Sequence, residues 1–383
     1  MNWLNKLANT KNSAAFWEIL GKISPKFNAQ PSQISKQAWE NYFTKCYSAP
    51  PTILNQSQKK YIEILFKRNN LPNPPTSQTQ EIISKDEIFL AIKQLAKNKA
   101  AGKDSILNEM LKSSFPHFID LLYQLFNKCW KNHKFPSSWG EVLVIPIYKK
   151  GNKSSPDNYR PISLVQNIAK LYLTIIQKKL VAWVDSRGLI PDAQTAFRKG
   201  MGCPEQLFTL RSLISKQYSN ESGCTYVLFA DLSKAFDSVD HVLLWEKLKA
   251  FGIPKALLAN IQSFYSQLVM QVKTDQGLTK KIKITRGVLQ GDPISPILFN
   301  LFLSDLPNCL PKEIGVKSNN VTTNILMFAD DIALLATDHA QLNKLIKRLK
   351  IFLDLNMLNL NPNKSKVIIF AKKIRICHSN KIR

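Results

Sequence analysis

Two adjacent carboxylates interrupt an apolar stretch in the last quarter of the sequence. Between Ile325 and Ala336 every residue is apolar except Asp330 and Asp331. Neighbouring carboxylates flanked by buried strands are energetically unfavourable unless they pair or bind a metal ion. We expect a strand–turn–strand hairpin to hold them at its tip. An isolated Ala-Asp-Asp would favour an ordinary polar turn, so the interpretation depends on a second acidic site.

That second site is Asp231, which directly follows the apolar run CTYVLFA at 224–230. Taken alone, Asp231 is explained by a helix N-cap. We expect the nearby Asp237 and Asp240 to cap or pair rather than catalyse. If Asp231 and the hairpin occupy neighbouring strands, three carboxylates converge. Such a group suits two hard divalent cations roughly 4 Å apart, which promote phosphoryl transfer at the attacking and leaving oxygens.

A third segment with a chemical signature is RGVLQGDPISPILFNLFLSDL, at 286–306. Gly287 and Gly291 allow the backbone to approach a ligand closely, and Pro293 and Pro296 suit the start of the following helix. Alone, the segment indicates only a loop–helix junction.

The elements that must position these residues follow from hydrophobic periodicity. The pattern predicts buried strands at 224–230 and 324–329, and a further strand at EVLVIPIY (141–148). Helical periodicity appears at 241–251 and 295–306. We therefore expect an α+β fold, a sheet with helices packed on one face.

The N-terminal part of the chain is expected to form a small helical segment, followed by a linker. Aromatic residues at helical spacing, such as Trp39 and Phe43, predict a helical segment over 1–68. Residues 69–84 are interpreted as a linker because they begin with an uncharged stretch rich in Asn and Pro. Ser84 and Glu87 then form a capping-box signal for a helix.

The charge balance points to a polyanionic partner. Lys and Arg number 53 against 27 Asp and Glu, a formal net charge of +26, which favours nucleic acid as the partner. The six cysteines form no C-x-x-C pair, as expected for reduced thiols in an intracellular protein. The sequence shows no secretory signal and no apolar run long enough to cross a membrane. We expect a nuclear or cytoplasmic protein that is not secreted.

In their order and spacing, these segments resemble the reverse transcriptase domain of LINE-type (non-LTR) retrotransposons. The resemblance covers 85–370 and rests on seven segments: KNKAAGKDSI (97–106), NYRPISLVQNIAKLYLTIIQKKL (158–180), GLIPDAQTAFRKGMGC (188–203), YVLFADLSKAFDSVDH (226–241), RGVLQGDPISPILFN (286–300), FADD (328–331) and LNLNPNKSKVIIF (358–370). So many ordered motifs make coincidence a poor explanation.

The resemblance implies a right-hand polymerase core that copies RNA into DNA. Fingers would span 85–220 and the palm 221–370, followed by a basic tail at 371–383 in place of a complete thumb. The partners would be an RNA template, a DNA primer and deoxynucleoside triphosphates, with no membrane; the oligomeric state is not predicted. A truncated element copy, or a fragment of a longer protein, is the expected context.

The resemblance also implies residue roles. Two Mg²⁺ or Mn²⁺ ions would be held by Asp231, Asp330 and Asp331. Phe236 would crowd a ribose 2′-hydroxyl, and Gln290 and Gly291 would contact the incoming nucleotide and the template. Arg160, with Lys149 or Lys150, would bind the triphosphate. Arg198 would contact the template backbone, and Lys364 would donate a proton to the departing pyrophosphate. For Phe236 a core position, and for the basic residues a solvated surface, remain alternatives.

Two other functions remain open at this point. The first is a nucleic-acid-binding remnant without catalysis, which the missing thumb favours and the intact aspartates disfavour. The second is a protein similar to a group II intron maturase, which would normally continue into an RNA-binding domain. Dependence on divalent metal separates polymerase from remnant, because simple RNA binding needs no carboxylate-held metal.

Overall fold

The structure is a computed structural model that describes residues 34–50, 52–69, 82–218, 223–318 and 321–371. The expected linker falls largely outside the described residues, at 70–81. About half of the expected N-terminal segment (residues 1–33) and nearly all of the basic tail (372–383) also lie outside them.

A four-stranded antiparallel sheet carries the acidic residues. Its order is β11-β3-β10-β9, formed by β3 (Cys224–Ala230), β9 (Ile325–Phe328), β10 (Asp331–Ala336) and β11 (Lys366–Ala371). β3 coincides with the predicted strand at 224–230, and β9 lies within the one predicted at 324–329. The hairpin predicted around Asp330 and Asp331 is therefore confirmed as β9–β10.

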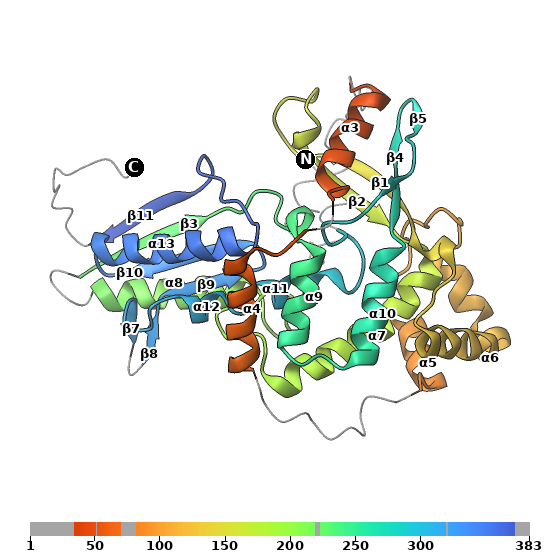
Figure 1. The fold of residues 1–383 in the computed structure, drawn as a ribbon, viewed down its shortest axis with the longest axis horizontal. Coiled ribbons are helices and arrows are strands. Elements are labelled where there is room, and N and C mark those ends of the chain that lie inside the picture. The colour runs from red at the N-terminus through yellow and green to blue at the C-terminus, as the bar shows by residue number, and fades with distance from the viewer. Residues whose placement is uncertain (1–33, 51, 70–81, 219–222, 319–320, 372–383) are drawn as a thin grey trace, which may run out of the picture.

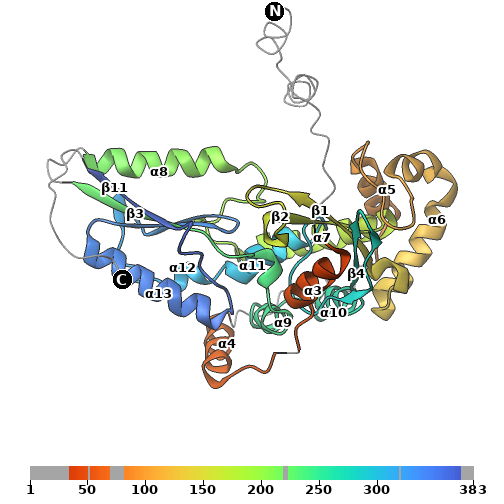
Figure 2. The ribbon, with the colours of Figure 1, turned by 90° about the horizontal axis from the view of Figure 1, so that it is seen from above.

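Helices cover both faces of this sheet, and the expectation of helices on one face was wrong. α8 (Cys203–Tyr218) packs on one face and α13 (His339–Leu355) on the other, as Figure 2 shows from above. The physical reason is that side chains on both sides of the strands are apolar. Val227 and Leu335 are buried on the α8 side, and their neighbours Leu228 and Leu334 are buried on the α13 side.

A second sheet lies at the other end of the molecule (Figure 1). Its path is β2-β1-β4-β5, with β6 also paired to β4; the strands are β1 (Glu141–Tyr148), β2 (Tyr159–Leu164), β4 (Val269–Thr274), β5 (Gly277–Leu278) and β6 (Ile282–Lys283). β1 and β2 form an antiparallel hairpin, and β1 runs parallel to β4. The strand predicted at 141–148 is confirmed as β1.

Helices fill the space between the two sheets. They are α7 (Asn167–Arg187), α9 (His241–Ala250), α10 (Lys255–Ser266), α11 (Ser295–Leu303) and α12 (Leu306–Cys309). α9 and α11 confirm the helices predicted at 241–251 and 295–306. As expected, Asp240 is a cap, because its carboxylate accepts the N–H of Leu243 at 2.9 Å at the start of α9.

Outer elements complete the described fold. α5 (Lys85–Gln94) packs on α6 (Asn108–Asn132), and β7 (Val316–Ser318) pairs with β8 (Val321–Thr323). The predicted capping box of α5 is confirmed by reciprocal hydrogen bonds between Ser84 and Glu87 at 3.1 and 2.8 Å. None of the described helices has the length and apolar character needed to span a membrane.

The N-terminal helices α3 (Lys36–Tyr47) and α4 (Gln56–Arg68) pack against the rest of the chain. Trp39 and Phe43 of α3 are each 1% exposed and join the main hydrophobic core, where the Trp39 ring meets Tyr159 of β2 edge-on. α4 packs on α9 and α13. These two helices are therefore buried against the elements that follow them.

Candidate active site

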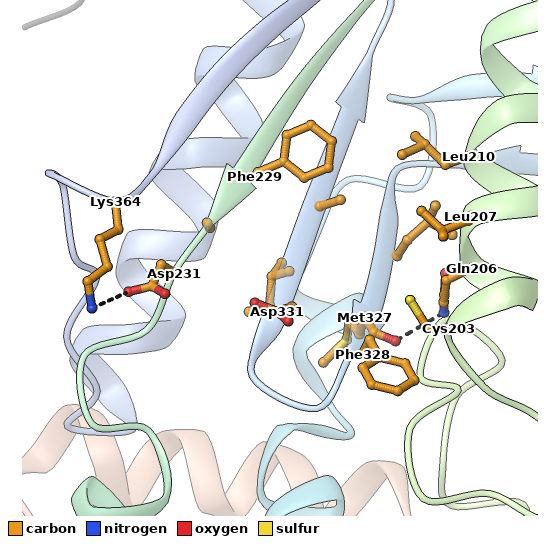
Figure 3. Close-up of a pocket in the computed structure, with 14 residues that line it drawn as sticks. Cys203, Gln206, Leu207, Leu210, Phe229, Asp231, Met327, Phe328, Asp331 and Lys364 are labelled. Carbon is orange, nitrogen blue, oxygen red and sulfur yellow. Dashed lines mark hydrogen bonds and ion pairs between the residues drawn. The ribbon is translucent and has the colours of Figure 1, made fainter. Parts of the chain in front are cut away.

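Asp231 and Asp331 lie opposite each other at one end of the four-stranded sheet. Ile332 of β10 pairs with Ala230 of β3, so the same antiparallel register brings Asp331 opposite Asp231 one step beyond the last pair. Like charges directly across two strands repel each other. Figure 3 shows both carboxylates at this end of the sheet. The convergence expected from the sequence is thus observed for these two residues.

Asp330 occupies the turn of the β9–β10 hairpin beside them. The pKa of its carboxyl is raised, chiefly by burial, and the negative charges of Asp331 and Asp231 raise it further. The positive charge of Lys149 acts in the opposite direction. The Asp330 carboxyl therefore lies close enough to Asp331 and Asp231 for their charges to affect it.

The hairpin turn is held by Gln194, a residue that the sequence did not single out. Ala329 has a left-handed backbone with φ of 53°, which a residue with a side chain rarely adopts. The buried Gln194 amide accepts the N–H of Ala329 at 2.9 Å and donates to its carbonyl at 3.2 Å. The only sequence signal was the position of Gln194 within 188–203, one of the family-like segments.

A second turn brings Lys364 to the site. The carbonyl of Asp231 accepts the N–H of Asn361 at 2.8 Å, and the N–H of Asp231 donates to Ser365 Oγ at 3.1 Å. The turn between these two contacts carries Lys364, whose Nζ lies 3.8 Å from Asp231 Oδ2 (Figure 3). The ammonium is half exposed, so water can reach it. Ser365 was another residue that the sequence did not single out.

The loop before α11 docks on the second sheet. The carbonyl of Gln290 accepts the N–H of Ser163 in β2 at 2.8 Å. Gly291 has φ of 125°, and a Cβ there would lie 2.7 Å from the Ser163 carbonyl oxygen. Glycine is therefore required at 291 both for its backbone conformation and for the close approach. The side-chain amide of Gln290 donates to Asp237 at 3.2 Å.

Phe236 lies in the short 3-10 helix Phe236–Ser238 that follows β3. Its ring stacks on Phe299 of α11, with centroids 4.4 Å apart and planes 14° apart. The side chain remains partly exposed while its inner face packs on the core. The position agrees with the core position considered from the sequence, because the ring packs on Phe299. It also leaves part of the ring exposed, as a contact with a ribose would require.

The basic residues expected to bind substrate differ in whether their side chains form hydrogen bonds within the protein. Lys149, Lys150 and Arg160 are exposed on the β1–β2 hairpin. Arg198 is more constrained, because its guanidinium donates to the carbonyls of Pro191 and Gln194 at 3.4 and 3.3 Å. Arg198 therefore braces its own loop, a role that neither sequence interpretation included.

A pocket of about 330 Å³ opens beside the carboxylates. Asp231, Asp331 and Lys364 form its polar side, and apolar side chains from α8 and the sheet, among them Leu207 and Phe229, form the rest (Figure 3). A pocket with one charged wall and one apolar wall suits a ligand that has both an anionic part and an apolar part.

The donor set fits divalent metal ions. Carboxylate oxygens are the ligands that hard cations prefer, and a cation beside these three aspartates would offset the negative charges of Asp331 and Asp231, which add to the effect of burial on the Asp330 pKa. Within the described ranges, no three His, Cys, Asp or Glu side chains already stand in the arrangement of a metal site. The backbone register brings Asp231 and Asp331 to the same end of the sheet, with Asp330 in the adjoining turn.

Comparison with known proteins identifies the family. Residues 147–379 match the family model described as reverse transcriptase (RNA-dependent DNA polymerase). Three relatives come from Drosophila melanogaster. The retrovirus-related Pol polyprotein from type-2 retrotransposable element R2DM is 26% identical over 88% of this chain and 32% of the relative. The RNA-directed DNA polymerase from mobile element jockey is 29% identical over 82% of this chain and 35% of the relative, and the probable RNA-directed DNA polymerase from transposon BS is 31% identical over 65% of this chain and 27% of the relative.

The chain spans about a third of the length of these curated relatives. The family match includes both acidic segments, the loop before α11 and the β1–β2 hairpin from Ile147 onward. The chain therefore belongs to the reverse transcriptase family, in the LINE-type (non-LTR) retrotransposon group to which these relatives also belong.

Proposed function

We propose that this chain is the catalytic core of an RNA-directed DNA polymerase, which extends a DNA primer on an RNA template. Residues 85–220 would act as the fingers and 221–370 as the palm of a right-hand polymerase. In support, the exposed basic β1–β2 hairpin and the aspartates lie on different sheets, although the sheet of the hairpin also takes in β4, β5 and β6 from the 221–370 range. Activities that reside in the remainder of a longer protein are outside this proposal.

The catalytic group would be Asp231, Asp330 and Asp331, holding two Mg²⁺ or Mn²⁺ ions. When bound, these ions supply Lewis acidity at the primer 3′-hydroxyl and charge stabilisation at the leaving pyrophosphate. Lys364 would donate a proton to the pyrophosphate from its place 3.8 Å from Asp231. The observation that carries this proposal is the register that sets Asp331 opposite Asp231, with Asp330 in the adjoining turn.

Substrate binding would involve the loop before α11 and the β1–β2 hairpin. Gln290 and Gly291 would contact the incoming nucleotide and the template. Lys149 and Arg160, both exposed, would bind the triphosphate through charge-assisted hydrogen bonds. In support, the positive charge of Lys149 opposes the raised pKa of Asp330, and the loop that carries Gln290 is bonded to β2 of the hairpin through Ser163.

Two further residues would select and hold the polymer. Phe236, supported from beneath by Phe299, would exclude a ribose 2′-hydroxyl and so favour deoxynucleotides. Arg198 would contact the template backbone with the part of its guanidinium that does not brace the 191–194 loop; its side chain is 28% exposed. Such an enzyme would act in the nucleus, the cytoplasm or both.

The test is deoxynucleotide incorporation on a primed RNA template, with Mg²⁺ or Mn²⁺, by the purified chain. Incorporation should require the metal and fall below detection in Asp330→Ala/Asp331→Ala. Glu313→Gln is the matched control, since this exposed carboxylate lies away from the site and should leave the rate unchanged. A folded wild-type chain that binds the primed template but incorporates nothing would instead identify a nucleic-acid-binding protein without catalysis.

A further inference from the structure

Three segments that are distant in the sequence meet at one partly buried carboxylate, that of Asp237. The hydroxyl of Tyr47, the last residue of α3, donates a hydrogen bond to Asp237, in the turn after β3. The side-chain amide of Gln290, in the loop before α11, donates to the same Asp237 oxygen at 3.2 Å. Tyr47 is 3% exposed. This carboxylate therefore joins the N-terminal helix to the residue proposed to contact the nucleotide.

Backbone hydrogen bonds hold the same three segments in register. The carbonyl of Tyr47 accepts the N–H groups of Thr285 and Arg286 at 2.9 and 3.2 Å. Val288 donates to the carbonyl of Phe236 at 2.9 Å. The loop before α11 is thus fastened on one side to α3 and on the other to the turn that carries Asp237.

The packing at Gly287 leaves little freedom for this arrangement to shift. A Cβ on Gly287 would lie 3.0 Å from the Tyr47 ring and 3.0 Å from the Asp237 carbonyl oxygen. The glycine has φ of 87°, in the left-handed region that side chains disfavour. The absence of a side chain therefore allows the Tyr47 ring to reach Asp237 across the loop.

Hydrogen-bond chemistry then determines the orientation of the Gln290 amide. An ionised carboxylate only accepts hydrogen bonds, so the group that faces Asp237 must be the NH₂ of Gln290, and its carbonyl oxygen is left available as an acceptor. The Tyr47 hydroxyl, as a second donor, helps to keep the largely enclosed carboxylate charged. Burial raises the pKa of Asp237, and the bonds from Tyr47 and Gln290 oppose that rise.

We propose that Tyr47 and Asp237 are positioning residues for the nucleotide site, which hold the Gln290 amide with its carbonyl oxygen toward the incoming nucleotide. The inference rests on the proposed function, because Gln290 has this role only in a polymerase. It adds the N-terminal helix α3 to the elements that set nucleotide affinity. Tyr47 and Asp237 act through Gln290 and touch no substrate.

The first experiment measures kcat and KM for deoxynucleotide in the full chain and its variants. Asp237→Asn nearly preserves the shape and still accepts from Tyr47, but it no longer forces the Gln290 amide into one orientation. KM should rise about tenfold, the size expected when a hydrogen bond to a charged group is lost, and kcat should change little. Tyr47→Phe should raise KM less than Asp237→Asn does.

A double-variant cycle separates positioning from general damage to the structure. In a Gln290→Ala background, Asp237→Asn should no longer raise KM, because the amide that it orients is gone. If Asp237→Asn has its full effect there as well, Asp237 acts independently of Gln290 and the proposal is wrong. Thr52→Val is the matched control, since the Thr52 hydroxyl also joins the N-terminal part to this region, through Asp240, without reaching Gln290.

A second measurement does not depend on activity. The side-chain amide resonance of ¹⁵N-labelled Gln290 should shift and broaden in Asp237→Asn and shift in Tyr47→Phe, and it should stay unchanged in Thr52→Val. A resonance that is the same in Asp237→Asn as in wild type would overturn the positioning role even in a chain without polymerase activity. Wild-type inactivity with the expected spectra would count against the proposed function only.

Discussion

The carboxyl groups near the centre of the molecule are of two kinds. Asp240 and Asp292 lie where protein donors satisfy them, Asp240 at the start of α9 and Asp292 at the start of α11. Asp231 and Asp331 instead line an open pocket, where the described part of the chain offers Asp231 only a lysine 3.8 Å away. At the scale of single residues, this contrast distinguishes structural carboxylates from those that face a ligand site.

Asp292 should make stability depend on pH. Burial raises its pKa to about 6, although the N–H groups of Ile294 and Ser295 donate to it, each at 2.7 Å. The unfolded value is about 3.9, so between pH 4 and pH 6 the unfolded chain binds fewer protons than the folded one. The free energy of unfolding should therefore fall over this window as pH rises, by on the order of 2 to 3 kcal/mol.

Asp292→Asn isolates this effect from the other titrating groups. Asparagine keeps a carbonyl oxygen for the two N–H groups, and its NH₂ can donate to Ser295 or Tyr265, whose hydroxyls contact Asp292 in the structure. Urea unfolding from pH 4 to pH 7.5 should show wild type losing stability relative to this variant as pH rises. A difference between the two that does not vary with pH would contradict the assignment.

At the scale of elements, the β9–β10 hairpin depends on a partner outside its own sheet. A short parallel bridge joins Gln194 to Met327, and the Gln194 side chain also binds both backbone groups of Ala329. The segment from 193 to 196 thus supports the turn that carries Asp330. A turn held at φ of 53° by a buried side chain has a conformation that the hairpin sequence alone does not impose.

Gln194→Ala should loosen this turn. The N–H and carbonyl of Ala329 would lose their partner in a buried place, which lowers the free energy of unfolding by about 2 to 4 kcal/mol. Gln194→Glu keeps an acceptor for the N–H but has no donor for the carbonyl, so it should also destabilise. Hydrogen exchange should accelerate at residues 326–333, and deoxynucleotide incorporation should fall with it.

The matched control for this prediction is Gln37→Ala, which removes an exposed glutamine from α3. It should change the free energy of unfolding by less than about 0.5 kcal/mol. If Gln194→Ala behaves like this control in both stability and exchange, the amide does not hold the hairpin.

Several of these elements were predictable because their signals are local. The strands β1 and β3, the helix α9 and the capping box of α5 follow from periodicity and cap residues over stretches of 4 to 11 residues. The support of the hairpin by Gln194 was not predictable, because 135 positions separate Gln194 from Ala329. A contact across such a distance leaves no periodic trace in the sequence.

At the scale of the whole molecule, a buried ion pair and its hydrogen-bond partners join α4 to the rest of the chain. Lys247 of α9 is fully buried, and its Nζ lies 2.6 Å from Asp305 Oδ1. The hydroxyl of Tyr61 in α4 donates to Asp305, and Asn356 accepts from Lys247 at 3.0 Å. Burial lowers the pKa of Lys247, and the charge of Asp305 opposes this.

Removing one partner of this pair should be more damaging than removing both. Asp305→Ala leaves the Lys247 ammonium buried without a counter-charge and should lower the free energy of unfolding by about 3 to 5 kcal/mol. The double variant Lys247→Met/Asp305→Asn should recover most of that loss, because no isolated charge remains and Tyr61 keeps an acceptor. Denaturant unfolding of both variants measures the difference.

An exposed pair provides the comparison. Lys249→Met breaks the ion pair with Glu246 on the same helix, where solvent screens both charges, and should cost less than about 1 kcal/mol. Equal effects of Asp305→Ala and Lys249→Met would show that the buried network adds no more than a surface contact.

The net charge of +26 should make nucleic-acid binding depend steeply on salt. If the chain neutralises 6 to 10 phosphates, a number typical of such proteins, affinity for a primed RNA template should fall by about 10³- to 10⁵-fold between 50 and 200 mM salt. Fluorescence anisotropy measures this. Asp330→Ala/Asp331→Ala should keep the same slope, because these residues neutralise no phosphate; an affinity that is flat in salt would argue against phosphate-dominated binding.

The amino-acid sequence was sufficient to predict the acidic residues of the candidate site and the strands that carry them. An apolar run that ends at Asp231 and a second one interrupted by Asp330 and Asp331 are local patterns, and burial of the flanking residues enforces them. The order of the motifs was also sufficient for the family, which the match over 147–379 confirms.

The relations between distant segments became visible in the folded chain alone. The sequence predicted helices on one face of the sheet, whereas α8 and α13 cover both faces. An apolar run does not reveal which helix will bury which side of a strand. Equally, nothing local connects Tyr47 to Asp237 and Gln290, which lie 190 and 243 positions further along the chain. Such contacts arise when packing brings separate elements together, and buried polar groups must then find their partners there.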